Sequence, residues 1–593
     1  MPTSTLRSLA ALVLCTLLAA CASSGGVGQP REPQQAGLAE EAYTRGDFRA
    51  AADAFLALAE SDAGQRAHYR LRAAEALREE GDLGAVARLL GDIKRKRLAP
   101  EEALRYDLLD AECALADRDA ARALALLAMP EARLPAGLAT RRLELTARAQ
   151  AAHGDAFGAA RTRAALNRTL DGADRAQNER SLVDSLASLP AASLKELAEP
   201  LAPNDALRPW IEQALRKQGM ALPLVVLHPS RPVGTQQADG SGRWTREGYR
   251  ETRRVVLLLP LSGPLKSAAA AIRDGFFAAY FDQRGEAARA DVRVYDSGGT
   301  PEEALAAYQR AAQDGADRVV GPLTREAVGA LFAQGHLPVP VLALNQPESG
   351  ATPPPGSLAF GLAPDVEGAQ AAEHMVGLGI KEAVVFAATE DWAERASLAF
   401  RAQFESLGGK VVGEARLRDG EVNFAAAIRQ AVGNFATAGE AGLFLSLRPQ
   451  QARLLLPQLK LASVTLPAFA TSHVYGGSSN PGLDRDLDGL EFCDAPWLFD
   501  AAPGLPSREE LARSLETARG PGARLFALGL DAYALLPYQE WLGTHPDSYL
   551  PGATGQLAAD SFGRVHRLLT WARFDAGVAR PSAGLSLGGA QAP

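Results

Sequence analysis

An alternation of apolar strands and amphipathic helices across residues 254–345 constrains the fold of this chain more than any other feature. Residues 255–259 form a short, continuous apolar run, as expected for a strand buried on both faces, and a Pro/Gly turn at 260–264 ends it. Apolar positions then recur at helical spacing from Ala268, and the strand–helix pattern repeats up to residue 344. This alternation predicts a parallel sheet with right-handed crossovers, which binds ligands at the carboxyl ends of its strands.

The same alternation occurs a second time between residues 357 and 470. Two such sets on one chain predict a two-lobed α/β domain, spanning residues 254–575, with a cleft between the lobes. The pattern then loosens into a Gly-, Ser- and Asn-rich loop at 471–487, a strand-like stretch at 489–499, a long helix at 525–541 and a closing stretch at 563–574. We expect residues 576–593 to form a frayed C-terminal tail.

Residues 36–219 are instead rich in Ala and Leu at helical spacing, with almost no strand signal. Paired helices are separated, at intervals of 35, 36 and 37 residues, by the turns Gly46-Asp47, Gly81-Asp82, Asp117-Arg118 and Gly154-Asp155. This period resembles the tetratricopeptide repeat, although Asp117 replaces one glycine and the usual Trp is missing. We therefore predict an all-α domain of TPR-like repeats. Its concave surface either binds a protein or peptide or is only a spacer, and the residues leave both alternatives open.

Residues 220–253 have no period and contain Pro- and Gly-rich turns, which is typical of an interdomain linker. We expect Trp244 and Tyr249 to dock part of this linker. Trp210 and Ile211, on the last helical segment before it, are expected to pack inward.

The first 20 residues are predicted to be a lipoprotein signal peptide. Arg7 gives a basic start, residues 9–20 are apolar but too short to span a bilayer, and Leu18-Ala19-Ala20-Cys21 matches the bacterial lipobox. The match implies a lipidated Cys21, and resemblance to sorted lipoproteins implies that Ala22 favours the outer membrane. Residues 21–35, rich in Gly, Ser, Pro and Gln, are typical of a flexible lipidated tether, here facing the periplasm. No other segment is long and apolar enough to cross a membrane.

Net charge and cysteine content limit the kinds of partner and the disulfide bonds that this chain can have. The net charge is −8, from 62 basic and 70 acidic side chains, which argues against a nucleic-acid partner. Of the 4 cysteines, Cys15 leaves with the signal and Cys21 carries lipid. Cys113 and Cys493 remain far apart, so no disulfide framework is visible and we expect two buried free thiols.

Motifs for catalysis find little support in the sequence. The 8 histidines form no HExxH pair, and CxxC, P-loop and helix-opening GxGxxG motifs are missing. One GxSxG occurs at 584–588, but it lies in the predicted tail, without the strand–turn–helix context of a nucleophile elbow. We therefore predict a chain that is not an enzyme, with no catalytic residues, no metal site and no cofactor.

Several motifs together carry a family resemblance. The runs LLLPLSGP (257–264), GADRVVGPLTREAV (315–328), VLALN (341–345) and PGATGQL (551–557) resemble the type I periplasmic substrate-binding fold. With the lipobox, the helical repeats, FGLAP (360–364), ATSHVYGG (470–477), GLEFCDAPWL (489–498) and ALGLDAY (527–533), nearly the whole mature chain resembles the LpoA family of outer-membrane lipoproteins. FCDAPWL is the most specific of these motifs.

This resemblance implies a regulatory function. Members of the family bind, from the outer membrane, the 1A-type class A penicillin-binding protein, a bifunctional peptidoglycan synthase, and stimulate its transpeptidase. The helical domain is expected to supply reach, and the α/β domain to carry the docking surface. As partner contacts we expect Tyr475, in an exposed loop, and Trp497, although aromatic residues at strand spacing such as Trp497 more often belong to the core.

The alternative is a lipid-anchored periplasmic solute-binding protein with a small ligand in its cleft. The candidate ligand contacts are Ser262, Gly263, Asn345 and Thr471, and the first two keep the hydroxyl and open amide of the binding-protein fold. The turn after the fourth strand is 345–348, Asn-Gln-Pro-Glu, where amino-acid binders have a hydroxyl-rich turn. This departure weakens amino-acid binding and leaves open a vestigial cleft or another ligand, such as a peptidoglycan fragment.

Overall fold

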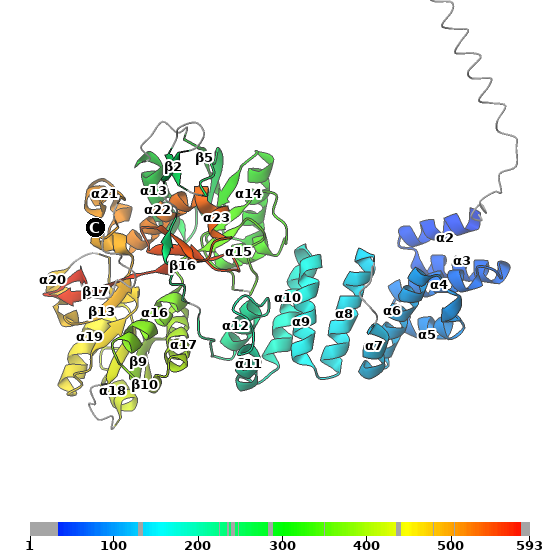
Figure 1. Ribbon diagram of the computed structural model, residues 1–593, viewed down its shortest axis with the longest axis horizontal. Coiled ribbons are helices and arrows are strands. Elements are labelled where there is room, and N and C mark those ends of the chain that lie inside the picture. Colours follow the sequence, from blue (N-terminus) through cyan, green and yellow to red (C-terminus); the bar gives the residue numbers. More distant parts are fainter. Residues whose placement is uncertain are drawn as a thin grey trace, which may run out of the picture. The chain divides into compact units, whose positions relative to one another are not determined.

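The computed structural model describes residues 34–582, with gaps at 129–134, 225, 234–235, 239–243, 247, 283–288, 349, 434–439, 478–479 and 503. The chain forms two compact units, Met1–Asp155 and Ala156–Pro593, and Figure 1 labels many of their helices and strands. The predicted signal peptide, Cys21, most of the tether and the GxSxG run at 584–588 lie outside the described residues.

The described part of the first unit is helical, as the sequence predicts. Turn-linked pairs are formed by α2 (Gln34–Thr44) with α3 (Phe48–Ser61), α4 (Arg66–Glu79) with α5 (Leu83–Gly91), and α6 (Pro100–Ala116) with α7 (Ala120–Leu127), and α8 (Ala136–Ala152) follows. Phe55, Leu77 and Leu109 share one buried cluster that runs across successive pairs. Each pair therefore buries its apolar face against its neighbours, which is how helical repeats are stabilised.

The turns between paired helices explain the Gly-Asp signature. Gly81 has a φ of +82°, a left-handed conformation that glycine adopts without strain, and the Asp82 carboxylate then caps α5 by accepting a hydrogen bond from Ala85 N at 2.9 Å. In the third pair Arg118 takes the left-handed position, with a φ of +63°, and Asp119 is the cap. The residue that replaces glycine is thus Arg118, and the prediction of Asp117 was wrong by one position.

The last predicted repeat helices pack on the α/β part. These are α9 (Ala156–Leu166), α10 (Gly172–Ala187), α11 (Ala191–Ala198) and α12 (Arg208–Lys217). Trp210 and Ile211 of α12 share a buried cluster with Val256 and Phe332, which confirms that they pack inward. The predicted boundary at 219–254 therefore marks a change of secondary structure inside the second compact unit. The division into domains at 36–219, 220–253 and 254–575 stays a prediction.

The first lobe is built on a nine-stranded sheet. Its order is β1 (Arg231–Pro232), β14 (Ser548–Pro551), β15 (Gln556–Ala559), β16 (Arg564–Leu568), β8 (Leu358–Phe360), β7 (Val341–Ala343), β6 (Arg318–Val320), β4 (Arg254–Leu259) and β5 (Asp291–Asp296). Strands β16, β8, β7, β6, β4 and β5 are parallel. Helices α13 (Lys266–Asp282), α14 (Pro301–Gln313) and α15 (Arg325–Phe332) alternate with them, and the Thr324 hydroxyl caps α15 by accepting a hydrogen bond from Ala327 N.

The second lobe has a seven-stranded sheet with the order β10 (Lys410–Leu417), β9 (Glu382–Ala388), β11 (Ala441–Ser446), β12 (Ala468–Ala470), β13 (Glu491–Asp494), β17 (Thr570–Asp575) and β18 (Val578–Pro581). The first five strands are parallel, and β17 and β18 are antiparallel additions. Its helices include α16 (Pro364–Gly377), α17 (Asp391–Ser406), α18 (Ala425–Val432) and α19 (Pro449–Leu461). The predicted fold class, helices followed by a two-lobed α/β domain, is confirmed.

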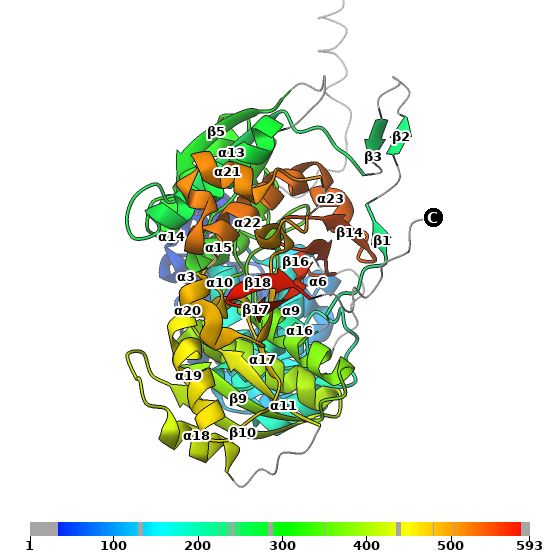
Figure 2. The ribbon, with the colours of Figure 1, turned by 90° about the vertical axis from the view of Figure 1, so that its left-hand side faces the viewer.

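Two kinds of connection hold the lobes together. The chain crosses from the first lobe to the second after β8 and again at Leu569, between β16 and β17, and Figure 2 shows β17 and β18, in red, where the lobes meet. Helix α22 (Ala523–Leu535) buries Phe526 in the second lobe's core and Leu528 in the first lobe's core. Gly529 of α22 lies so close to α13 that an added Cβ would stand 2.1 Å from Ile272 O. The two lobes therefore share one helix as well as the crossings.

Several predicted elements differ from the structure, each for a local reason. The stretch 563–574 forms two strands in different sheets, and the predicted helix 525–541 divides into α22, a 3₁₀ turn at Leu536–Tyr538 and α23 (Gln539–Leu542), where Pro537 cannot continue the α-helical hydrogen bonds. The strand-like stretch ends at Asp494 and becomes a 3₁₀ turn at Pro496. The start of the predicted frayed tail instead forms β18, because residues 578–581 pair with residues 572–575 of β17.

The predicted linker is also partly folded. Arg231 and Pro232 form β1 on the edge of the first lobe's sheet, and β2 (Gln236–Ala238) pairs with β3 (Trp244–Arg246). Tyr249 packs edge-on against Tyr538 with ring centroids 5.9 Å apart, so the predicted docking of Tyr249 is confirmed. The Trp244 side chain lies outside what the structure describes.

Candidate functional site

The four predicted cleft contacts lie at the carboxyl ends of strands but do not form one pocket. Ser262 and Gly263, after β4, are exposed, whereas Thr471, after β12, is fully buried. Asn345, after β7, donates from Nδ2 to Leu323 O at 3.1 Å and accepts at Oδ1 from Gln346 N, so its amide shapes its own loop. None of the four lines either of the two cavities described below.

The carboxyl edge of the second lobe's sheet instead holds a buried carboxylate. Glu367, in the first turn of α16, accepts hydrogen bonds from Ser472 N and Ser472 Oγ, each at 3.0 Å. His473 Nδ1 and Arg567 Nη2 both lie 3.6 Å from its oxygens. Burial alone would raise the pKa of Glu367, but His473, Arg567 and the Ser472 N–H outweigh it and lower the pKa to about 2. The carboxylate is therefore charged at every physiological pH.

Two hydroxyls at the same edge remain unused. Thr471 Oγ1 and Ser446 Oγ, which follow β12 and end β11, are buried without a hydrogen-bond partner in the described part of the chain. Buried hydroxyls are normally satisfied, so this edge has spare capacity for a small polar group or water. Thr471 is the one predicted cleft contact that belongs to this cluster.

The most specific motif, FCDAPWL, has a structural role. Asp494 is buried and accepts from Arg524 Nε at 2.8 Å, while Arg524 Nη2 donates to Ser472 O at 2.7 Å and Tyr475 O at 2.8 Å. Burial raises the pKa of Asp494, and the Arg524 guanidinium opposes that rise. Arg524 thus ties α22 to β13 and to the loop after β12. The Cys493 thiol is buried, and burial together with Glu367 raises its pKa well above the usual range, which makes the thiol unreactive.

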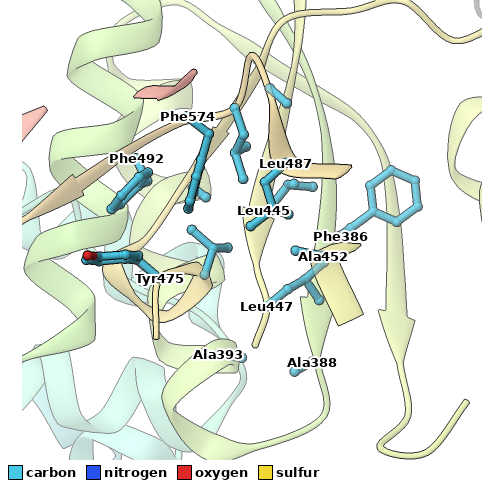
Figure 3. Close-up of a cluster of buried hydrophobic side chains, with 14 of the residues drawn as sticks. Phe386, Ala388, Ala393, Leu445, Leu447, Ala452, Tyr475, Leu487, Phe492 and Phe574 are labelled. Carbon is cyan, nitrogen blue, oxygen red and sulfur yellow. The ribbon is translucent and has the colours of Figure 1, made fainter. Parts of the chain in front are cut away.

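Tyr475 and Trp497 are both buried, so the expected exposure of Tyr475 is wrong and Trp497 belongs to the core. Tyr475 is 4% exposed, and Figure 3 shows its ring beside Phe492 with Phe574 nearby, at centroid distances of 5.6 and 6.0 Å. Trp497 is 1% exposed, stacks on Phe526 at 5.3 Å and donates from Nε1 to Pro506 O at 2.8 Å. A loop rich in Gly and Ser suggested exposure for Tyr475, but this loop folds back over the sheet, and its tyrosine completes the core.

The motifs ALGLDAY and PGATG interlock through one aspartate. Asp531, in α22, accepts hydrogen bonds from Ala553 N at 2.5 Å, Thr554 N at 2.7 Å and Thr554 Oγ1 at 2.6 Å. Burial raises the pKa of Asp531 to about 6, although these three donors act to lower it. The turn between β14 and β15 is therefore fastened to the helix that both lobes share.

A second ion-pair network joins the two lobes, and the sequence analysis missed it. Arg325 Nη1, on α15 of the first lobe, lies 3.6 Å from Asp391 Oδ2, on α17 of the second. Asp365 pairs with Arg395 and lies 3.8 Å from Arg216 of α12, beside a small cavity of about 50 Å³. Burial and the charges of Arg395 and Arg216 lower the pKa of Arg325. Arg325 lies in the motif GADRVVGPLTREAV, but its partners lie outside the quoted motifs, and only the fold brings these residues together.

No group of three or more His, Cys, Asp and Glu side chains in the described part is placed to hold a metal ion. Among the described helices, none combines the length and the apolarity needed to span a bilayer.

Comparison with known proteins identifies the family of this chain. A family model described as LppC putative lipoprotein matches residues 47–221 and 249–577, which is more than half of the chain and includes both compact units. The chain belongs to the LppC family. This confirms the resemblance to a lipoprotein family that the motifs indicated.

Relatives of this LppC-family chain carry a functional name. A protein of Photobacterium profundum, named penicillin-binding protein activator LpoA, is 26% identical over 97% of each chain. A protein of the same name from Serratia proteamaculans is 29% identical over 50% of this chain and 48% of its own. Among solved structures, the LpoA (YraM) C-domain from Haemophilus influenzae, described as a regulator of PBP1A, is 25% identical, covers 56% of this chain and all of its own, and has a TM-score of 0.48.

Proposed function

We propose that this chain is a regulatory lipoprotein that binds a penicillin-binding protein and activates it. The observation that carries the proposal is the relative named penicillin-binding protein activator, which matches 97% of this chain and of its own length. A match of that extent includes the helical repeats and both lobes, so the whole architecture is shared.

We further propose where the protein is located in the cell and which penicillin-binding protein it binds. Cys21 is the lipidated residue, the anchor lies in the outer membrane, and the folded units face the periplasm. The partner is the 1A-type class A penicillin-binding protein, whose transpeptidase is stimulated by direct contact. The helical repeats supply reach toward the inner membrane, and the α/β lobes supply the docking surface. The lipobox and the family-wide resemblance support this arrangement.

The proposed activity is regulation without catalysis or cofactor. The conspicuous polar residues of the family motifs are engaged inside the fold: Asp494 by Arg524, Asp531 by the turn between β14 and β15, and Ser472 by Glu367. Side chains that are fully used in internal hydrogen bonds stabilise a structure and are not available to a substrate. This favours a protein that works through its surface.

Solute binding in the cleft remains the second candidate function. The observation in its favour is the pair of unpartnered buried hydroxyls in the described part of the chain, Thr471 Oγ1 and Ser446 Oγ, at the carboxyl edge of the second lobe's sheet. A ligand there would have to open the contacts between the lobes, including that of Arg325 with Asp391.

The proposal is tested with the soluble chain from Ala22 onward and the 1A-type synthase of the same bacterium. We expect saturable binding in surface plasmon resonance and faster peptide cross-linking by the synthase when the chain is added. The control is the same chain after heat denaturation. Lack of binding and of stimulation, with a synthase that is active alone, would overturn the activator function.

A further inference from the structure

A cavity of about 630 Å³ lies where the chain crosses from the first lobe to the second. Its lining combines α16 of the second lobe, the hairpin of β14 and β15 in the first lobe, and the crossing residues Leu568, Leu569 and Thr570. Gly377 and Ala501 on its lining are exposed, so the cavity communicates with solvent. Its volume falls within the roughly 300–1,000 Å³ that is usual for small-molecule sites. None of the four predicted cleft contacts lines it, so this is a different place from the cleft edge described above.

The hydrogen-bonding groups that are unused on this lining are uncharged. Tyr549, Gln556, Thr570 and Ser582 line the cavity, and their side chains make no hydrogen bond within the described part of the chain; Ser582 Oγ is a buried atom without a partner there. Three hydroxyls and one carboxamide can each donate and accept. Such a set is complementary to ligand hydroxyl and amide groups.

The ionisable residues on the lining are already paired. His228 Nε2 lies 2.9 Å from Glu373 Oε2, and His374 Nε2 lies 3.2 Å from Glu491 Oε2. The Gln370 amide, also on the lining, is hydrogen-bonded through both its nitrogen and its oxygen to the segment that crosses between the lobes: Nε2 donates to Arg567 O, and Oε1 accepts from Leu569 N. A charged ligand would therefore find no free counter-charge among the described residues of the lining and would lose its hydration without compensation.

Aromatic and apolar surface completes the lining. The Trp571 indole stacks on the His374 imidazole with ring centroids 3.8 Å apart, which fixes its plane, and Tyr549 and Leu505 are further lining residues. A rigid aromatic ring offers a flat apolar contact at low entropic cost, beside polar groups that orient the ligand.

We propose that this hinge cavity is a binding site for a neutral short oligosaccharide. A pyranose ring has an apolar C–H face for the aromatic side chains and hydroxyls for Tyr549, Gln556, Thr570 and Ser582. Because the lining comes from both lobes and from the strand that joins them, a bound saccharide bridges the lobes and favours one angle between them. Saccharide binding at this site is a separate property from the proposed activator function. It can be measured on this protein alone, without the synthase.

The test is isothermal titration calorimetry of the soluble chain from Ala22 with three neutral probes: chitotriose, maltotriose and tetra-alanine. We expect saturable binding of at least one trisaccharide and none of the peptide. Thr570→Val and Gln556→Leu should each weaken it about fivefold to tenfold, as expected for one lost hydrogen bond. Thr544→Val, at an exposed threonine away from the lining, should leave it unchanged.

Three outcomes overturn the proposal: no saturable binding of either trisaccharide at millimolar concentration, binding of tetra-alanine alone, or saccharide binding that both lining variants leave intact. Thr570→Val is nearly isosteric, so an unchanged melting temperature verifies that a weakened affinity does not come from unfolding. Binding of the synthase is scored separately with the same variants, so failure at this cavity is distinct from failure of the activator function.

Discussion

Glu367 and Ser472 are joined by two hydrogen bonds, both ending on the Glu367 carboxylate, one from Ser472 N and one from Ser472 Oγ. Glu367 lies in the first turn of α16, the helix that follows the crossing between lobes, and Ser472 follows β12 of the second lobe. The pair therefore fixes the start of that helix to the carboxyl edge of the sheet.

Glu367→Ala should destabilise the α/β unit by about 3–5 kcal/mol, because it leaves the buried Arg567 guanidinium without its carboxylate and Ser472 without its acceptor. Urea unfolding followed by circular dichroism measures the loss. Glu394→Gln, on the exposed face of α17, is the matched control and should change stability by less than about 0.5 kcal/mol. Equal effects of the two substitutions would show that the buried cluster contributes nothing.

The stability of the α/β unit should depend on pH through Asp531. Its pKa rises from an ordinary value of 3.8 to about 6 in the folded protein, so the folded state holds the proton more tightly than the unfolded chain. Its contribution is complete below pH of about 4 and is lost as the pH rises through about 6, on the order of 3 kcal/mol. Glu367 acts in the opposite direction: its contribution is present above its ordinary pKa of 4.5 and is lost as the pH falls toward about 2.

Asp531→Asn isolates the first of these effects. As the pH rises from 4 to 6, the melting temperature of the wild-type chain should fall relative to that of the variant. The variant lacks the Asp531 carboxyl group and therefore lacks its contribution to the pH dependence. At neutral pH the variant should also be less stable by about 1–3 kcal/mol, since its NH₂ group replaces one acceptor oxygen, either Oδ1 opposite Ala553 N or Oδ2 opposite Thr554 N and Oγ1. Parallel pH profiles for the two proteins would contradict the raised pKa.

Gly529→Ala should separate α13 from α22. The added Cβ would meet Ile272 O at 2.1 Å, so the helices must move apart, at a cost of about 1–3 kcal/mol or more. Gly137→Ala in α8 is the control, because an added Cβ meets no atom within 4 Å there and the higher helix propensity of Ala should stabilise by up to about 1 kcal/mol. Differential scanning calorimetry measures the melting temperature of both variants. We expect it to fall for Gly529→Ala and to stay unchanged or rise for Gly137→Ala.

Trp497→Ala should act on folding and not specifically on partner binding. The indole is buried against Phe526, so truncation leaves a cavity and should cost about 3–5 kcal/mol. Phe281→Ala is the surface control, since Phe281 is 64% exposed and should tolerate the change. If the variant keeps its melting temperature while losing affinity for the synthase, Trp497 is a contact residue after all.

Cys21→Ser should convert the membrane-bound protein into a soluble periplasmic one. In the proposed function the lipid is attached to the Cys21 thiol, and several acyl chains hold a protein at a membrane far more strongly than one. Cell fractionation with immunoblotting and metabolic labelling with palmitate measure both consequences. Labelled, membrane-bound protein from the Cys21→Ser gene would contradict the assignment of Cys21.

The sequence by itself determined most of the elements and the family. Continuous apolar strands such as 255–259, helical periods and the Gly-Asp turns report local physics, and the structure reproduces them, including the inward Trp210. The family motifs likewise lie in contiguous runs, so their resemblance can be recognised without a fold.

Only the tertiary structure decided what those residues touch. Tyr475 and Trp497 were predicted to be available for a partner, yet both are buried, because the loop after β12 folds back onto the second lobe and α22 crosses beneath it. Glu367 with Ser472, Arg325 with Asp391, and the lining of the hinge cavity join residues far apart in sequence. Burial and long-range pairing depend on which segments meet, and periodicity records only which face of one segment is apolar.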